Sequence, residues 1–188
     1  MNEGHLQFCA SEEWRQMIEA TILPEALAGI DLGPEVVEIG PGPGLTTDVL
    51  RRLADHLTAV EFDPELAEAL GKRLSGTNVT VLRGDATALE LRDGRFSGAA
   101  CFHMLHHVPT GEAQDRIFSE LARVLQPGGR LVAADGVWSE ERDLFHEGDV
   151  FNPIDPSGLE ARLSAAGFGD IELRTYDLGW ITTAVSAR

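Results

Sequence analysis

Three glycines alternate with two prolines in residues 36–44, VVEIGPGPG, where a short apolar run ends. Glycine has no Cβ, so a turn that is rich in it lets a ligand approach the backbone closely. Pro41 and Pro43 lack the N–H donors that a pyrophosphate group would need at such a turn. The spacing is also GxGxG, whereas dinucleotide-binding loops have GxGxxG. The turn is therefore predicted to hold a nucleoside without phosphates in preference to NAD.

Two acidic residues end the next two apolar runs. Glu61 lies in LTAVEF (57–62), seventeen residues after Gly44, which is close to the spacing at which a carboxylate binds ribose hydroxyls. Asp85 ends NVTVLRGD (78–85) and can accept a hydrogen bond from an exocyclic amine such as that of adenine. Ligands of open α/β sheets bind beyond the carboxyl ends of the strands. The glycine turn and these two carboxylates together predict a nucleoside pocket.

The elements that position these residues alternate between strands and helices. Short apolar runs predict strands over 35–40, 57–62, 78–85, 96–104 and 130–135. Apolar residues at helical spacing predict helices over about 45–53, 66–74, 117–125 and 156–166, the third ending at QPGG (126–129) and the fourth at Gly167. Such alternation predicts a mostly parallel sheet with helices on both faces. Two late strands, near 168–176 and 180–187, are separated only by the short turn DLG, so they are predicted to pair antiparallel.

Five sequence blocks together resemble the class I S-adenosylmethionine-dependent methyltransferases, over about residues 34–135. The blocks are VVEIGPGPGLTTDVL, VEFDPELAEAL, RGDATAL, FHMLHHV and LARVLQPGGRLVAAD. The resemblance implies a Rossmann-like α/β fold with a seven-stranded, mostly parallel sheet of order 3-2-1-4-5-7-6 and an antiparallel last strand. It also implies S-adenosylmethionine as cofactor and S-adenosylhomocysteine as product. One departure is Ser97, because many relatives have Asp at this position after an aromatic residue.

The same resemblance implies a role for each residue at the strand ends. Glu38 and the turn Gly40–Gly44 would line the methionine side of the cofactor, Glu61 would hold the ribose, and Asp85 with Ala86 would flank the adenine. The residues predicted to contact the cofactor are Glu38, Gly40, Pro41, Gly42, Gly44, Glu61, Phe62, Asp85, Ala86 and Phe102.

The chain of 188 residues is predicted to form one methyltransferase domain. Its four predicted parts are an N-terminal helical cap (1–30), a cofactor-binding core (34–135), a lid-like insertion (136–155) and a C-terminal helix with the antiparallel strand pair (156–188). Ser11 is a candidate N-cap for a helix with an apolar face, which Pro24 would interrupt or restart. That face would consist of Trp14, Met17 and Ile18. Ser139 is a candidate N-cap for a short helix ending at Gly148.

His103, just past the fourth predicted strand, is the candidate general base, or the residue that orients the methyl acceptor. The alternative is a polar rim residue without a catalytic task. The residues proposed for the acceptor pocket come from the cap, the end of the fourth predicted strand and the insertion. The aromatic side chains of the insertion could equally pack the insertion onto the core. The residues proposed for this pocket are His5, Cys9, Trp14, His106, Trp138 and Phe145.

His103, His106 and His107 could also suggest a metal cluster. Zinc sites, however, usually add carboxylate or thiolate ligands at matched spacing, and the sequence shows none beside these histidines. No metal site is therefore expected. Cys9 and Cys101 are far apart in sequence, and we expect them to be small buried residues.

The formal net charge is -16, with 31 Asp and Glu against 15 Lys and Arg, so nucleic acid and anionic membranes are not expected as partners. The N-terminus lacks a signal-peptide pattern, and a cytoplasmic location is expected.

The sequence favours methyl transfer to an oxygen, nitrogen or carbon atom of a small molecule by in-line displacement, and leaves the oligomeric state open. The alternatives are a non-catalytic adenosyl-binding or regulatory protein and a nicotinamide-dependent oxidoreductase.

Overall fold

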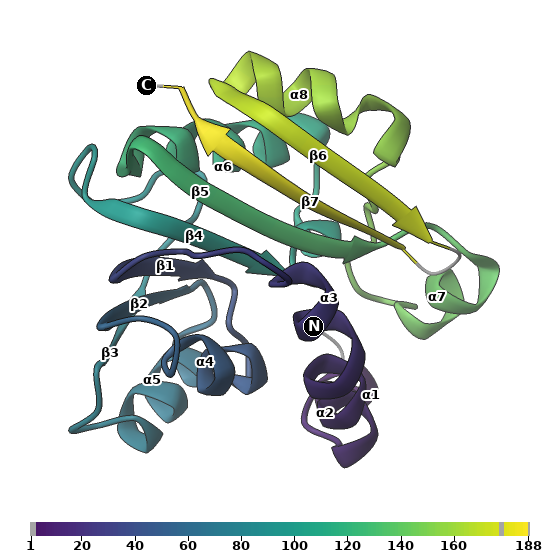
Figure 1. The fold of residues 1–188 in the computed structure, drawn as a ribbon. Coiled ribbons are helices and arrows are strands. Elements are labelled where there is room, and N and C mark those ends of the chain that lie inside the picture. The colour runs from purple at the N-terminus through teal and green to yellow at the C-terminus, as the bar shows by residue number, and fades with distance from the viewer. Residues whose placement is uncertain (1–2, 177–178, 188) are drawn as a thin grey trace.

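The computed structural model of the chain describes residues 3–176 and 179–187. Its centre is a seven-stranded sheet of order β3-β2-β1-β4-β5-β7-β6 (Figure 1). Only β7 runs antiparallel to its neighbours, β5 and β6. The strands are β1 (Glu35–Ile39), β2 (His56–Glu61), β3 (Val79–Arg83), β4 (Phe96–Phe102), β5 (Leu125–Gly136), β6 (Phe168–Tyr176) and β7 (Gly179–Ser186). The predicted fold class, strand order and antiparallel strand pair are confirmed.

Both faces of the sheet are buried, as the near-continuous apolar strands require. Successive side chains of a strand point to opposite faces, and in β4 Ala99 and Cys101 join one core cluster while Ala100 and Phe102 join the other. The first cluster packs against α6 (Gly111–Val124) and α8 (Leu159–Ala166), and the second against the N-terminal helices. Figure 1 shows these two groups of helices on opposite sides of the sheet.

The remaining helices are short. They are α1 (Glu3–Cys9), α2 (Glu12–Met17), the π-helical turn η1 (Ile18–Ile22), α3 (Leu23–Ala26), α4 (Leu45–Leu50), α5 (Pro64–Arg73), the 3-10 turns η2 (Leu105–His107) and η3 (Pro156–Gly158), and α7 (Glu140–Phe145). Both α1 and α7 lie on the side toward which the arrows of β4 and β5 point (Figure 1). Within the described residues, no helix is both long enough and apolar enough to cross a bilayer.

The predicted helix starts are confirmed where a serine caps them. The Ser11 hydroxyl accepts a hydrogen bond from the backbone N–H of Trp14 at 3.1 Å, and the Ser139 hydroxyl accepts one from that of Arg142 at 3.2 Å. The second of these helices ends at Phe145, before Gly148. Both caps place a β-region residue ahead of the first turn, which is the usual N-cap geometry.

One expectation at the ends of elements is corrected. The strand predicted over 130–135 begins at Leu125, directly after the end of α6 at Val124, and QPGG (126–129) lies inside it at the register shift between the pairs Phe96–Leu125 and Gly98–Arg130. Pro24 restarts the N-terminal helix, which is one of the two predicted alternatives, because it is one of the first two residues of α3 and α3 follows η1 directly. The predicted apolar face of the N-terminal helix (Trp14, Met17 and Ile18) is only partly buried, because Ile18 is buried but the side chain of Met17 is 38% exposed.

Candidate active site at the carboxyl ends of the strands

The glycine turn after β1 has a backbone that only glycine adopts readily. Gly40, Gly42 and Gly44 have φ values of 65°, 53° and 90°, all in the left-handed region. A Cβ at Gly40 would lie 2.8 Å from the Cβ of Met104, which is closer than real side chains approach. The turn is closed by a hydrogen bond of 2.9 Å from the Gly44 N–H to the Pro41 carbonyl, and α4 begins directly after it.

Glu38, near the end of β1, is buried and fastens this turn to the helix that follows. Its two carboxylate oxygens accept hydrogen bonds from the hydroxyls of Thr46 and Thr47, the latter at 2.7 Å. Burial raises the pKa of this carboxyl to about 7, although the two hydroxyls favour its charged form. Glu38 therefore sets the position of the turn through α4.

Glu61, at the end of β2, connects the turn to the neighbouring strand. One carboxylate oxygen accepts a hydrogen bond from the backbone N–H of Gly42 and the other from that of Asp63, both at 2.9 Å. A carboxylate oxygen has two lone pairs, so each still has capacity for another donor. The side chain is buried, and this strengthens its hydrogen bonds relative to those in water.

The next strand end presents Asp85 and Ala86. One oxygen of the exposed Asp85 carboxylate accepts hydrogen bonds from the Thr87 N–H at 2.8 Å and from the Thr87 hydroxyl at 2.7 Å. Phe62 is 73% exposed beside the end of β2, whereas Phe102 is buried in the core cluster of the N-terminal helices. Of these two aromatic rings, only Phe62 has a face accessible to a ligand from solvent.

His103, directly after β4, has a left-handed backbone with φ of 52°, which is uncommon for a residue with a side chain. Its N–H donates to the Ala134 carbonyl at 2.8 Å, and its ring lies edge-on to Trp14 with 4.9 Å between the centroids. Nε2 is buried without a hydrogen-bond partner among the described residues, and Nδ1 lies 4.0 Å from an oxygen of Asp135. Burial lowers the pKa of His103 to about 4, so the ring is neutral at pH 7 and is a weaker base than a solvated imidazole.

Four other histidines gather beside this strand end. His5 comes from α1, His106 and His107 come from η2, and His146 follows α7. The centroids of all six pairs of rings lie 4.1–6.3 Å apart. Phe145 contacts His5 at a centroid distance of 4.9 Å. Segments remote in sequence thus meet over the ends of β4 and β5.

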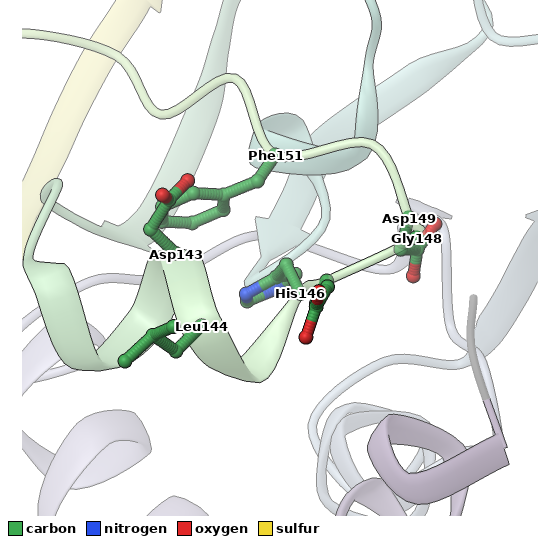
Figure 2. A pocket seen from close by; sticks show the side chains of 7 residues that line it. Asp143, Leu144, His146, Gly148, Asp149 and Phe151 are labelled. Atoms are coloured by element: carbon green, nitrogen blue, oxygen red, sulfur yellow. The ribbon is translucent and has the colours of Figure 1, made fainter.

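The segment after α7 borders a pocket of about 340 Å³. Its lining runs from Asp143 and Leu144 on α7 to Asp149 and Phe151 further along the chain (Figure 2). The His146 ring stacks on the Phe151 ring with 4.3 Å between centroids. The pocket is therefore continuous with the histidine cluster.

The methyltransferase-domain family matches residues 37–133, slightly more than half of the chain. The chain belongs to the class I S-adenosylmethionine-dependent methyltransferases. The matched range contains the glycine turn, Glu61, Asp85 and all three histidines from 103 to 107. S-adenosylmethionine is the methyl donor of this family.

Two curated relatives and one solved structure illustrate the similarity. A ubiquinone biosynthesis O-methyltransferase of Xanthomonas oryzae is 35% identical over 111 residues, which are 55% of this chain and 44% of the relative. A ribosomal RNA small subunit methyltransferase A of Geobacter sulfurreducens is 34% identical over 126 residues, 59% of this chain and 45% of the relative. The chain thus spans a little under half the length of either relative. The DhpI–SAH complex superposes with a TM-score of 0.77 at 21% identity, covering 97% of this chain and 91% of that one, which supports the fold.

The fold brings several of the proposed acceptor residues together. His5, His106 and Phe145 meet in the histidine cluster, and Trp14 lies against His103. Trp138 is 63% exposed and has no ring contact among the described residues. Cys9 is half-buried at the end of α1, and burial raises its pKa to about 11, as burial also raises that of Cys101. Both thiols are therefore protonated at pH 7 and have no nucleophilic character.

Two residues of this region, Asp135 and His146, were not predicted from the sequence. Asp135 is the penultimate residue of β5 and is buried. One of its carboxylate oxygens lies 2.5 Å from Nδ1 of His106 and accepts a hydrogen bond of 2.7 Å from the backbone N–H of Gly136. The rule that singled out Glu61 and Asp85, an acid at the end of a strand, applies to Asp135 as well. His146 has no such signal, because its place in the cluster follows from the fold of the insertion.

Proposed function

We propose that this chain transfers the methyl group of S-adenosylmethionine to a small-molecule acceptor by in-line displacement at oxygen, nitrogen or carbon. The observation that carries the proposal is the hydrogen bond from the Gly42 N–H to Glu61, which joins the glycine turn to a buried carboxylate at the ends of two adjacent parallel strands. This pair lies where an open α/β sheet binds its ligand.

On the cofactor side, the free lone pairs of Glu61 accept hydrogen bonds from the ribose hydroxyls, and Asp85 accepts one from the adenine amine. The glycine turn leaves space for the methionine part. The sulfonium methyl group is already activated, so the chief task of the protein is to place the acceptor in line with it. Such positioning supplies roughly 7–11 kcal/mol of the barrier.

On the acceptor side, a small molecule is favoured because the strand ends are covered. The rings of His5 and Phe145 contact each other, although one belongs to α1 and the other to α7. Together with the contacting pair His103 and Trp14 they supply aromatic rings on which a planar substrate can stack. If the acceptor is a hydroxyl, His103 takes its proton. The net charge of -16 disfavours an RNA substrate, in contrast to the name of the Geobacter relative.

Incubation with S-adenosylmethionine that carries a labelled methyl group tests this proposal. The acceptor panel should contain catechols and other phenols, small amines, and ribosomal RNA. We expect label in a small molecule and none in RNA. Label in RNA would overturn the small-molecule assignment. Cofactor binding without labelled product across the panel would instead support the non-catalytic alternative.

A further inference from the structure

The four histidines of the cluster are arranged as a group of metal ligands. Each offers one ring nitrogen, and the four nitrogens lie within 4.8 Å of one another. In a tetrahedral zinc site, with Zn–N bonds of about 2.0–2.1 Å, neighbouring ligand nitrogens stand roughly 3.4 Å apart. The rings would therefore have to move closer together around a bound ion.

The outward hydrogen bonds of two rings fix which nitrogen faces the centre. Nδ1 of His146 lies 2.6 Å from the Arg142 carbonyl, which can only accept, so this nitrogen carries the proton. Nε2 of His146 then holds a lone pair, and it is buried without a hydrogen-bond partner among the described residues. Nδ1 of His106 is held in the same way by the carboxylate of Asp135. A ligand histidine typically donates its other N–H to a carboxylate or a backbone carbonyl.

A second carboxylate lies outside the other two rings. One oxygen of Asp149 is 3.9 Å from Nδ1 of His5 and 4.0 Å from Nδ1 of His107. The cluster of four rings is therefore flanked by two acids, Asp135 and Asp149, whose negative charges would balance a divalent cation.

We propose that His5, His106, His107 and His146 bind one Zn²⁺ or a similar divalent transition metal. Imidazole ligands suit this class of metal. Four protein ligands complete a tetrahedral shell and leave no open position, which is the arrangement of a structural site. The ion would fasten α1 and the segment after α7 to η2, over the ends of β4 and β5. Metal binding by these four histidines does not depend on the proposed methyl transfer, although His5 also belongs to the proposed acceptor surface.

Metal content and zinc titration of the purified chain test the proposal. The protein is stripped with a chelator and titrated with Zn²⁺ in competition with a chromophoric indicator. We expect one equivalent of tightly bound Zn²⁺ in the wild type, with a higher thermal unfolding temperature and slower hydrogen exchange in residues 3–9 and 140–146. His146→Ala should lose tight binding. Asp135→Asn should weaken it about 10- to 100-fold, as for other residues that support a metal ligand.

His56→Ala is the matched control, because His56 is an exposed histidine outside the cluster, and it should keep the full equivalent. If His146→Ala fails to unfold cooperatively, His107→Ala replaces it in the same titration. Failure of the stripped wild type to take up a stoichiometric equivalent overturns the proposal. So does equal zinc affinity of the wild type and a folded cluster variant.

Discussion

The backbone N–H of Gly42 donates a hydrogen bond of 2.9 Å to the carboxylate of Glu61. The two residues lie beyond the ends of adjacent parallel strands, so this bond fixes the glycine turn relative to β2. It also orients the carboxylate that we assign to the ribose. Replacing this one side chain should therefore affect the cofactor more than the fold.

Glu61→Gln should weaken binding of S-adenosylhomocysteine roughly 10- to 100-fold. The amide retains one acceptor oxygen but loses the charge, and hydrogen bonds to charged groups are worth about 1.5–3 kcal/mol. Isothermal titration calorimetry measures the change. Glu65→Gln, an exposed neighbour on α5, serves as control and should bind like the wild type. Wild-type affinity in Glu61→Gln would remove the proposed ribose contact.

Gly40→Ala should destabilise the chain by about 1–3 kcal/mol more than Gly76→Ala does. Both glycines have a positive φ, 65° and 79°, so they share the cost of placing a side chain on such a backbone. Only at Gly40 would the new Cβ collide with another residue, at 2.8 Å from the Cβ of Met104. Urea unfolding measures both variants. Equal losses would show that the contact with Met104 does not constrain the turn.

Glu38 should make stability depend on pH. Its pKa is raised from 4.5 to about 7 by burial, so between these values the folded state binds more protons than the unfolded state. The contribution of Glu38 is complete below pH 4.5 and is lost as the pH rises toward 7. The free energy of unfolding should fall less over this range in Glu38→Gln than in the wild type, as denaturant titrations at several pH values would show. A constant difference between the two proteins would contradict the raised pKa.

His103→Ala should lower kcat by roughly 10²- to 10⁴-fold with a hydroxyl acceptor, the usual contribution of a general base. Its affinity for S-adenosylhomocysteine should stay unchanged, because Glu61 and Asp85, which we assign to the ribose and the adenine, lie at the ends of β2 and β3. His56→Ala is again the control. An unchanged turnover number with the true acceptor would leave His103 as a polar residue of the rim.

The grouping of the glycine turn, Glu61 and Asp85 at one edge of the sheet could be predicted from sequence because each part lies next to a recognisable strand. The GxGxG turn, the acid seventeen residues later and the Gly-Asp after the third strand all lie next to apolar runs. Parallel neighbouring strands then bring their ends to one edge. The Ser97 departure also has a local explanation: its hydroxyl donates to the Glu35 carbonyl at 2.8 Å and accepts the Glu35 N–H at 3.0 Å.

The histidine cluster could not be predicted in the same way. His106 and His107 are adjacent, but His5 and His146 come from segments about a hundred and forty residues apart. Only the packing of α1 and of the segment after α7 brings them together. The early start of β5 at Leu125 was missed for a similar reason, because it depends on the pairing of Leu125 with Phe96, 29 residues earlier in the chain.

Calorimetric titration of the wild-type chain with S-adenosylhomocysteine most directly tests whether an adenosyl group binds at the ends of β1, β2 and β3. We predict saturable binding at one site per chain, displaced by S-adenosylmethionine and unaffected by NAD. Absence of binding of either sulfur compound to folded protein would contradict the assignment of this pocket.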